Sequence, residues 1–468
     1  GQSDDPHVER LLQGFAFLAG RIHHKLDDEF PELTDALLNV LYPHYLAPIP
    51  SMALIQFEAD PRAADLANGF LVPRHTLLRT NAVDKLRCSY RTAFAIKLWP
   101  ITLVEARLQP PPFGAALSPP PGTAAALRLR FDCGGPEGFA GLSLDALRIH
   151  LAGESAIVPD LYELICNDTL RMLFRPVNAA GPPTNDVVIG SDRIAETLVP
   201  AGFGRDEGLL PYPSHALPGY RLLTEFFTYP AKFHFVDVGG WREVAARRFG
   251  AQLELILFLR RTLPGREHTV SAASFRLGCT PIVNLFPQTV EPRALDQKLA
   301  EYPLVPDADH PRGMEVHSVR AVRAVGADGG SREYRPFYSF RHGIAREMQR
   351  AFWYAARRPS PGRGDSGTDV AVTLVDLDFK ATRAPDETLV VETLCTNRNL
   401  PARLRQLGED IALESDIPGP RMSIRCVRAP TLPLRMPPGR GTYWRLISHL
   451  SLNHLSLADG SDGLHALK

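Results

Sequence analysis

The chain has 468 residues, of which 44% are hydrophobic and 22% charged, values close to globular averages that exclude extensive disorder. Lys+Arg and Asp+Glu both total 52, so the basic excess typical of general nucleic-acid binders and anionic-membrane binders is missing. The 42 Pro and 36 Gly residues exclude long coiled coils and helical solenoids.

Cysteine usage and the start of the chain bear on its compartment. Six cysteines without a Cys-x-x-Cys motif are too sparse for a disulfide scaffold and wrongly spaced for a zinc finger, so we expect free thiols in a reducing compartment. No run of about 18 apolar residues occurs, which predicts no membrane insertion. The start, Gly1 to Asp5, has neither Met nor a leader, so we expect a fragment, lacking its true N-terminus, of a soluble cytoplasmic protein.

The first 46 residues predict a helical hairpin. Apolar residues recur at three- and four-residue steps from Val8 to Leu26, which places them on one helix face. The acidic run 27–29 and Pro31 start a second helix, which Pro43 ends or kinks. Two such helices cannot cover both apolar faces by themselves. The predicted interface residues on these faces are Leu11, Phe15, Leu18, Ile22, Leu33, Leu37 and Leu41.

The rest of the chain predicts short strands separated by turns. Leu127 to Asp132 alternates as a half-exposed strand should, and Leu253 to Leu259 is apolar enough for burial on both faces. Helices are expected from about Asp160 to Phe174, from Tyr220 to Phe227 and from Tyr443 to about Leu457. The other expected strands are 94–98, 233–238, 315–322, 352–357, 370–377, 388–394 and 424–427.

These elements predict an α+β, mainly β fold: a multi-domain chain of antiparallel or mixed β domains with an N-terminal helical hairpin and a C-terminal helix. The expected domains are the hairpin at 1–47, a first β-rich domain with one helix at 48–200, an α/β segment at 201–310, and a third β-rich domain at 311–468 whose C-terminal part is missing.

Residue patterns that suggest chemistry are weak. Gly364-Asp365-Ser366-Gly367 spells the nucleophile tetrapeptide of chymotrypsin-like proteases, but its Pro- and Gly-rich surroundings favour a flexible hairpin tip. Asp376 and Asp378 share one face of a strand without a partner His or a third acid, so a solvated strand edge is favoured. His spacings match no metal motif. We therefore expect no catalytic residues, cofactor or metal.

Several long sequence runs that suggest no catalytic chemistry resemble those of a known family. They begin with Phe15–Ala19, continue through Leu26–Pro31 and Leu41–Leu46 to Pro48–Met52, and recur downstream at 275–286, 392–398 and 444–453. In these runs the chain resembles the TssF family (also called ImpG or VasA), baseplate subunits of bacterial type VI secretion systems. The runs are ordered and cover most of the chain, so they are far more specific than the tetrapeptide.

The resemblance implies a structural role. TssF is similar to a wedge protein of contractile phage tails. Two TssF copies join one TssG, and this wedge recruits TssK, TssE and the spike VgrG to template tail tube and sheath assembly. The resemblance thus implies a cytoplasmic location at the inner face of the cell envelope, with no nucleic-acid partner and no catalytic residues.

The resemblance also gives the hairpin a role. We expect its interface residues to form a bundle with a second copy and TssG; the alternative is that they dock on their own β domain. Because two identical chains in one wedge meet different neighbours, the Pro-rich stretches 109–122 and 200–218 are candidate hinges.

Two other classes of protein remain open. A β-rich hydrolase or carbohydrate-active enzyme would need Asp376, Asp378 or Ser366 among convergent titratable groups in a deep pocket. A small-ligand binding module would need one concave apolar pocket with a few polar groups.

Overall fold

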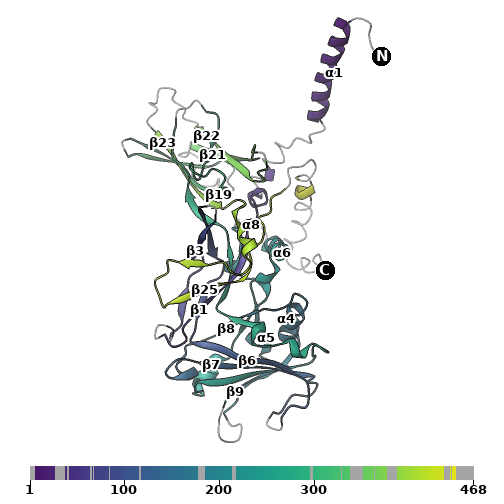
Figure 1. Cartoon of the computed structure of the whole chain (residues 1–468), viewed down its shortest axis with the longest axis vertical. Helices are drawn as coiled ribbons and strands as arrows, with labels where there is room; N and C mark the ends of the chain where they lie inside the picture. The colour runs from purple at the N-terminus through teal and green to yellow at the C-terminus, as the bar shows by residue number, and fades with distance from the viewer. Residues whose placement is uncertain are drawn as a thin grey trace. The chain divides into compact units, whose positions relative to one another are not determined.

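The computed structural model has two compact units (Figure 1). It describes residues 6–26, 37–38, 42–63, 66, 68–83, 85–114, 117–177, 185–212, 218–295, 299–327, 329–337, 351–362, 364–376, 387–436, 443 and 445–448. Unit 1 takes in Gly1–Ile49, Pro287–Cys395 and Leu434–Lys468, and unit 2 takes in Pro50–Phe286 and Thr396–Pro433. Strands dominate the described residues, and their sheets are antiparallel or mixed, which confirms the mainly β class.

A five-stranded antiparallel sheet in unit 2 runs in the order β10-β9-β13-β7-β6. In β7, Leu127, Leu129 and Phe131 are buried while the alternate Arg128 and Arg130 are half-buried, as the sequence predicted. The strands are β6 (Ile101–Gln109), β7 (Ala125–Cys133), β9 (Thr169–Pro176), β10 (Val187–Ile189) and β13 (Gln252–Leu259).

Strand β13 is buried on both faces, also as predicted. Leu255 and Leu257 face the main core, whereas Ile256 and Phe258 join a second cluster on the opposite face. Phe113 and Leu117 pack against that second cluster. The Pro-rich loop between β6 and β7 therefore covers the back of the sheet.

This covering loop corrects the expectation that 109–122 is a hinge. Its flanking strands β6 and β7 are adjacent and antiparallel, with Gln109 opposite Ala126. A loop that joins two neighbouring strands of one sheet cannot act as a joint between domains. The second candidate hinge, 200–218, likewise begins and ends in unit 2.

The helix expected from Asp160 to Phe174 is shorter than predicted. Helix α4 spans Val158–Asn167, with Pro159 at its start and Leu161, Leu164 and Ile165 buried. From Thr169 the chain is strand β9, because Met172 to Phe174 pair with Leu255 to Leu257 of β13. A short apolar run fits a buried helix and a buried strand equally well, so only the long-range pairing decides.

A four-stranded sheet, in the order β11-β12-β8-β14, shares the main core of unit 2 with the five-stranded sheet. Strands from both sides of residue 200 form these two sheets, because β12 pairs with β8 and β13 pairs with β7. The elements are β8 (Leu147–Leu151), α5 (Ile194–Thr197), β11 (Leu198–Ala201), β12 (Phe235–Val238), α7 (Trp241–Ala246) and β14 (Phe275–Leu277).

Trp241, at the start of α7, lies at the centre of this core. Its ring lies 5.2 Å from that of Phe174 and 5.8 Å from those of Phe131 and Phe139, and its indole N–H donates to the Val238 carbonyl at 2.8 Å. Gly240 precedes it with φ +90°, and a Cβ there would meet Ile189 and Phe174 at under 3 Å. Glycine is therefore required at the turn that places Trp241.

A six-stranded sheet in the order β24-β3-β4-β15-β1-β25 and a two-stranded sheet of β2 and β5 complete the sheets described in unit 2. Helix α6 (Pro218–Thr228) and the 3-10 helices η3 (Arg205–Glu207) and η4 (Pro230–Phe233) lie in the same unit. The remaining bounds are β1 (Met52–Ala59), β2 (Phe70–Val72), β3 (Leu77–Val83), β4 (Leu86–Thr92), β5 (Ile96–Leu98), β15 (Cys279–Val283), α8 (Leu400–Leu404), β24 (Leu413–Ser415) and β25 (Met422–Arg428).

Unit 1 is built on a mixed sheet in the order β16-β23-β19-β20-β21-β22-β18, with β17 paired to β23. β20 and β21 run parallel, whereas β21 and β22 form a nine-pair antiparallel hairpin. The bounds are β16 (Phe286–Thr289), β17 (Arg293–Ala294), β18 (Tyr302–Pro303), β19 (Glu315–Gly326), β20 (Ser331–Pro336), β21 (Ala351–Pro359), β22 (Thr368–Asp376) and β23 (Glu387–Thr396).

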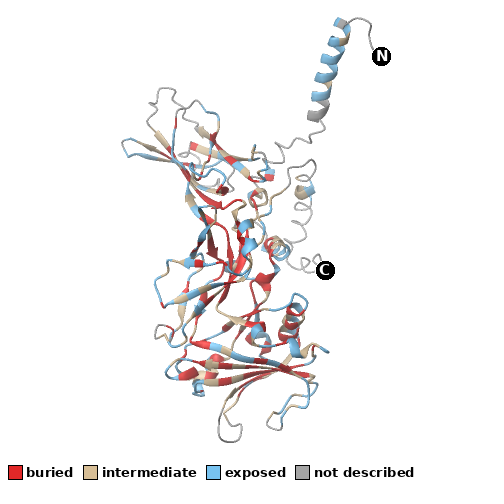
Figure 2. Ribbon diagram, in the orientation of Figure 1, coloured by how far each residue is buried: buried red, intermediate tan, exposed pale blue. Residues whose placement is uncertain are grey.

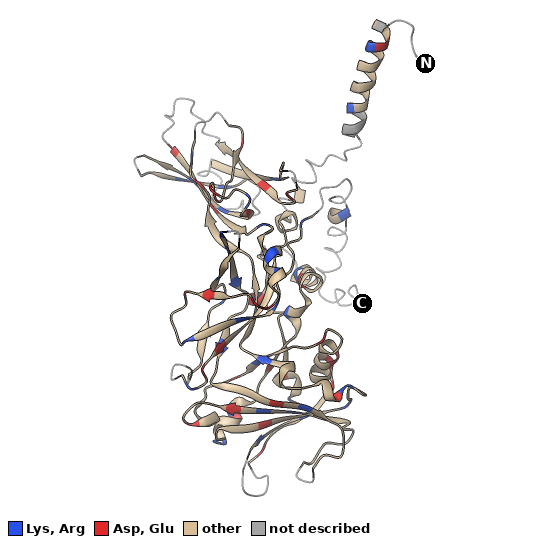
Figure 3. Ribbon diagram, viewed as in Figure 1, with Lys and Arg blue, Asp and Glu red and all other residues tan. Residues whose placement is uncertain are grey.

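Charged residues of both signs are interspersed over the described strands (Figure 3). Several Arg side chains pair with acids on neighbouring strands: Arg128 holds Glu254 with two bonds of 2.6 Å, and Arg148 holds Asp237 with two bonds of 2.7 Å. Among the described residues, no helix is long and apolar enough to cross a membrane.

Candidate interface surface

The first helix carries the clearest exposed apolar surface. Helix α1 spans Pro6–Leu26, with Pro6 at its first position and Glu9 in its first turn, both suited to a helix start. Its apolar side chains face solvent: Leu11 is 75% exposed and Phe15 is 71% exposed, and α1 is coloured as exposed over most of its described length (Figure 2). Val8, Leu11, Leu12, Phe15 and Leu18 form what we call the α1 stripe.

The α1 stripe occupies one side of the helix. At about 100° per residue, Val8, Leu11, Phe15 and Leu18 fall within a single sector, whereas Phe17 points to the opposite side. The Arg21 guanidinium lies 6.0 Å from the Phe17 ring centroid, so the side of α1 that carries Phe17 also carries a cation. Ile22 continues the helix, but its side chain lies outside the described part.

The second half of the predicted hairpin is described only in part. Leu37 is exposed, as an interface residue should be, while Leu33 and Leu41 lie outside the described residues. The neighbouring Leu38, which the sequence did not single out, is fully buried. Pro43 does not simply end a helix, because it starts the short helix α3 (Pro43–Leu46).

The residues of the hydrolase alternative are not brought together where they can be placed. Ser366 is exposed in the loop of the β21–β22 hairpin, where the Gly367 N–H donates to the Asp365 carboxylate at 2.9 Å. Asp376 lies opposite Ala351 at the other end of that hairpin. Eight residue steps of a strand separate the ends by about 27 Å. Asp378 lies outside the described residues.

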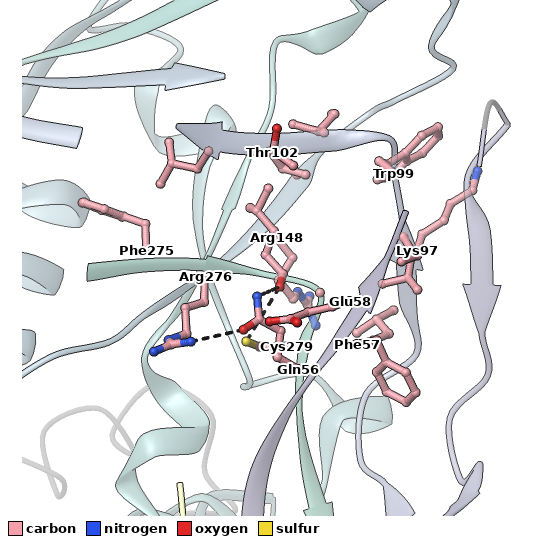
Figure 4. Close-up of a pocket in the computed structure, with 18 of the residues that line it drawn as sticks. Gln56, Phe57, Glu58, Lys97, Trp99, Thr102, Arg148, Phe275, Arg276 and Cys279 are labelled. Carbon is pink, nitrogen blue, oxygen red and sulfur yellow. Dashed lines mark hydrogen bonds between the residues drawn. The ribbon is translucent and has the colours of Figure 1, made fainter. Parts of the chain in front are cut away.

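A cleft of about 540 Å³ lies in unit 2, among β1, β5, β6, β8, β14 and β15 (Figure 4). Its polar groups serve the fold: Arg276 donates to the Gln56 amide oxygen at 3.2 Å, and the Gln56 amide donates to the Leu277 carbonyl at 2.9 Å. The Lys97 ammonium lies 4.4 Å from the Trp99 ring centroid, as a cation–π contact. The lining is largely apolar with several polar groups, and the bonds of Gln56 join strands of two neighbouring sheets.

The one thiol in the cleft is not activated as a nucleophile. Burial raises the pKa of Cys279 to about 12, so the thiol stays protonated near neutral pH. Arg148 is held by Asp237 and Glu207 with bonds of 2.7 Å. Its pKa is raised by these carboxylates against the opposing effect of burial. No lining residue described here combines a nucleophile with an activating base.

Comparisons with known proteins identify the family of this chain. The model of the family "Type VI secretion system, TssF" matches residues 1–468. The chain belongs to the TssF family. The type VI secretion system component TssF1 of Pseudomonas aeruginosa is 35% identical over 483 residues, a match that covers 99% of this chain and 76% of the relative.

Solved structures agree with this assignment. One chain from a TssK-TssF-TssG baseplate subcomplex, determined by cryo-electron microscopy, matches with a TM-score of 0.74 at 27% identity, covering 96% of this chain and 79% of that chain. A chain from the baseplate complex of a type VI secretion system matches with a TM-score of 0.58 at 25% identity, covering 96% and 73%. These two fold neighbours of the chain both come from baseplate complexes.

Two of the runs that carry the family resemblance meet in unit 2. Asn284, from the run 275–286, and Asn397, from the run 392–398, hydrogen bond to each other and are both buried. These runs hold the fold together, which explains why they suggest no chemistry. The sequence predicted a helix from Tyr220 to Phe227 but not that the apolar face of α6 is exposed.

Proposed function

We propose that this chain is a structural subunit of the type VI secretion baseplate and that it acts by assembly, not by catalysis. The observation that carries the proposal is the α1 stripe, an uncovered row of Leu and Phe side chains in a member of the TssF family. An exposed apolar helix face of this kind is typical of a surface that a partner helix covers.

The energetics favour a helical bundle. Burying one large apolar side chain contributes roughly 1.5–3 kcal/mol. Leu11, Phe15 and Leu18 are largely exposed in the chain alone, so most of that free energy is still available for association. We therefore assign the stripe, together with the predicted residues Ile22, Leu33, Leu37 and Leu41, to a bundle with a second copy and TssG.

The proposed binding partners are taken from the complexes in which relatives of this chain were solved. The solved relative was obtained as a complex named for TssK, TssF and TssG, and we extend these partners to this chain. Contacts with TssE and the VgrG spike, and a position at the cytoplasmic face of the envelope, are finer expectations from the family resemblance. The hydrolase alternative lacks support, since Ser366 and Asp376 lie at opposite ends of one hairpin.

The experiment compares two phenylalanines on one helix. Phe15→Asp places a charge on the α1 stripe, and Phe17→Asp places the same charge on the opposite side of α1. Both side chains are exposed, so neither change removes a core contact. Each variant is co-expressed with TssG, and the amount of TssG recovered with the tagged chain is measured.

We expect Phe15→Asp to lower TssG recovery by about tenfold or more, because each lost apolar burial is worth more than one tenfold step in affinity. Phe17→Asp should retain recovery within about twofold. Wild-type recovery with Phe15→Asp, or equal loss with both variants, would show that the stripe is not the assembly surface.

A further inference from the structure

Several neighbouring side chains of unit 2 carry buried polar atoms without a hydrogen-bond partner. Within the described part of the chain, these atoms include both ring nitrogens of His150, the hydroxyl of Tyr229 and Nε of Arg276. His150 is 4% exposed and Tyr229 is 2% exposed. Buried polar groups of folded proteins are almost always hydrogen bonded. A cluster of unpaired ones therefore points to a bound ligand, ion or water.

The three side chains belong to elements that pack side by side. His150 of β8 and Arg276 of β14 are paired residues of adjacent antiparallel strands, so their side chains lie next to each other on one face of the sheet. Tyr229 directly precedes η4. Burial lowers the pKa of His150, and the nearby Ala231 carbonyl of η4 opposes this only weakly, because neither ring nitrogen reaches hydrogen-bond geometry.

The ionisable groups around these side chains are basic. Burial is the main cause that lowers the pKa of His150 to about 3, and three basic side chains contribute to the same effect. They are His234, Arg428 and Arg276. Burial raises the pKa of Tyr229, whereas Arg428 lowers it. Because Arg428 acts on both His150 and Tyr229, its guanidinium lies within electrostatic range of both.

The cleft of about 540 Å³ in unit 2 borders these side chains, because Arg276 lines it. Figure 4 shows the Arg276 side chain beside Gln56, whose neutral amide oxygen accepts a hydrogen bond from it at 3.2 Å. His150, which is not part of the lining, lies behind Arg276. Cavities of about 300–1,000 Å³ are typical of small-molecule sites, so a small ligand can reach Arg276 through the cleft.

We propose that His150, Tyr229, Arg276 and Arg428, which we call the His150 cluster, bind an oxyanion of the phosphate type. All four side chains can donate hydrogen bonds, and the two guanidinium groups have no acceptor atom. Phosphate oxygens accept such bonds and also compensate the two neighbouring positive charges, whereas water compensates neither.

The two acids among the described lining residues of the cleft do not cancel this positive charge. Asp237 is held by Arg148 at 2.7 Å. Glu58 is exposed, so solvent screens its charge. Burial raises the pKa of Cys279 to about 12, so its thiol adds no negative charge near neutral pH. The part of the cleft next to Arg276 therefore favours an anion.

The test titrates inorganic phosphate into the full chain by isothermal calorimetry, and we expect saturable binding by the wild-type chain. Arg276→Gln should weaken it by about tenfold or more, because a charged hydrogen bond is lost. The matched control Arg260→Gln removes an exposed guanidinium directly after β13 in the same unit. Since exposed charges are screened by solvent, it should change the affinity by less than about twofold. No saturable binding, or equal losses in the two variants, would overturn the proposal.

Tyr229→Phe separates anion binding from a structural role. The change removes only the hydroxyl and keeps the buried ring. That hydroxyl has no hydrogen-bond partner among the described residues, so the melting temperature without phosphate should not fall. The affinity for phosphate should fall by about fivefold, because one hydrogen bond to the anion is lost. A lower melting temperature with unchanged affinity would overturn the proposal, because the hydroxyl would then serve the fold.

Phenyl phosphate distinguishes the two sources of such an anion. Binding tighter than that of inorganic phosphate by about tenfold or more would assign a phosphate ester whose apolar body lies in the cleft. Equal or weaker binding would assign the free ion, and either result upholds the oxyanion site. The His150 cluster shares no residue with the α1 stripe, so failure of these experiments leaves the proposed function standing.

Discussion

Asn284 and Asn397, which are 113 residues apart, exchange two hydrogen bonds in the interior of unit 2. The Asn397 N–H donates to the Asn284 amide oxygen at 2.7 Å, and the Asn284 amide donates to the Asn397 amide oxygen at 2.8 Å. That oxygen also accepts the Ser89 N–H at 2.8 Å. The chain leaves unit 2 after Phe286 and returns at Thr396, so this pair joins the two segments beside their crossing points.

Asn397→Ala should lower the free energy of unfolding by about 2–4 kcal/mol, because it leaves the Ser89 N–H and one of the two amide hydrogens of Asn284 without an acceptor in the interior, at about 1–3 kcal/mol for each group. Denaturant titration measures the change. Asn185→Ala, which removes a single exposed hydrogen bond to the Arg247 carbonyl, is the control and should cost under about 1 kcal/mol. Similar losses for both variants would contradict the role of the buried pair.

Arg435→Ala should destabilise unit 1. The Glu315 side chain is fully buried, and Arg435 donates to its carboxylate at 2.5 and 3.1 Å. Removing one partner of a buried ion pair costs up to about 3–5 kcal/mol, and here the two hydrogen bonds from Thr368 and the charge of the buried Arg357 still compensate part of the Glu315 charge. Hydrogen exchange in β19 and β22 should accelerate accordingly. In contrast, Arg358→Ala removes an exposed pair with Glu301, which is worth about 1 kcal/mol or less, and comparable acceleration there would contradict the prediction.

Lys232→Met should loosen α6. Burial lowers the pKa of Lys232, and the Glu225 carboxylate opposes that effect. With Met at this position the buried carboxylate loses its counter-charge, at about 3–5 kcal/mol. The double variant Glu225→Gln with Lys232→Met removes both charges and should recover part of the loss in melting temperature. A double variant less stable than Lys232→Met would show that the ion pair does not lock the helix.

His150 should make stability fall in mild acid. It is buried on β8 with its ring 4.7 Å from that of Phe235, and burial lowers its pKa from 6.5 to about 3. The unfolded chain therefore binds a proton below pH 6.5 that the folded chain refuses down to about pH 3. The stability that neutral His150 contributes is fully present above pH 6.5. As the pH falls below 6.5 the free energy of unfolding decreases, by about 2 kcal/mol at pH 5.

His150→Phe removes this titration and keeps an aromatic ring in place. The difference in unfolding free energy between pH 7 and pH 5 should shrink by about 2 kcal/mol in this variant. The comparison is made on slopes, so any constant packing cost of the larger ring cancels. An unchanged slope would mean that His150 is not the group that resists protonation.

Local pattern was sufficient for several elements. The three- and four-residue spacing from Val8 to Leu18 specified α1 and the side of it that is apolar. Alternation in 127–132 specified β7, and the Pro- and Gly-rich surroundings of Ser366 specified a hairpin tip. In each case neighbouring residues carry the information, because the periods of helix and strand act within one element.

Distant parts of the chain determine where α4 ends and where the Pro-rich loop lies. Helix α4 stops at Asn167 because Met172 to Phe174 pair with a strand more than eighty residues further on. The Pro-rich loop packs on the five-stranded sheet because the strands that flank it, β6 and β7, are neighbours in that sheet. Pairing between distant segments does not change the local spacing of apolar residues. The sequence alone could therefore not predict where α4 ends or what the Pro-rich loop covers.

The sequence by itself determined which residues are apolar and at what spacing, and hence the α1 stripe, the strand faces and the likeness to the TssF family. Only the tertiary structure decided which apolar faces are covered. Leu37 is exposed and its neighbour Leu38 buried, and α6 turns its charges inward because Lys232 and the backbone of 204–210 are there to bind them. Burial depends on what the rest of the chain brings to a face, and that is a property of the folded molecule.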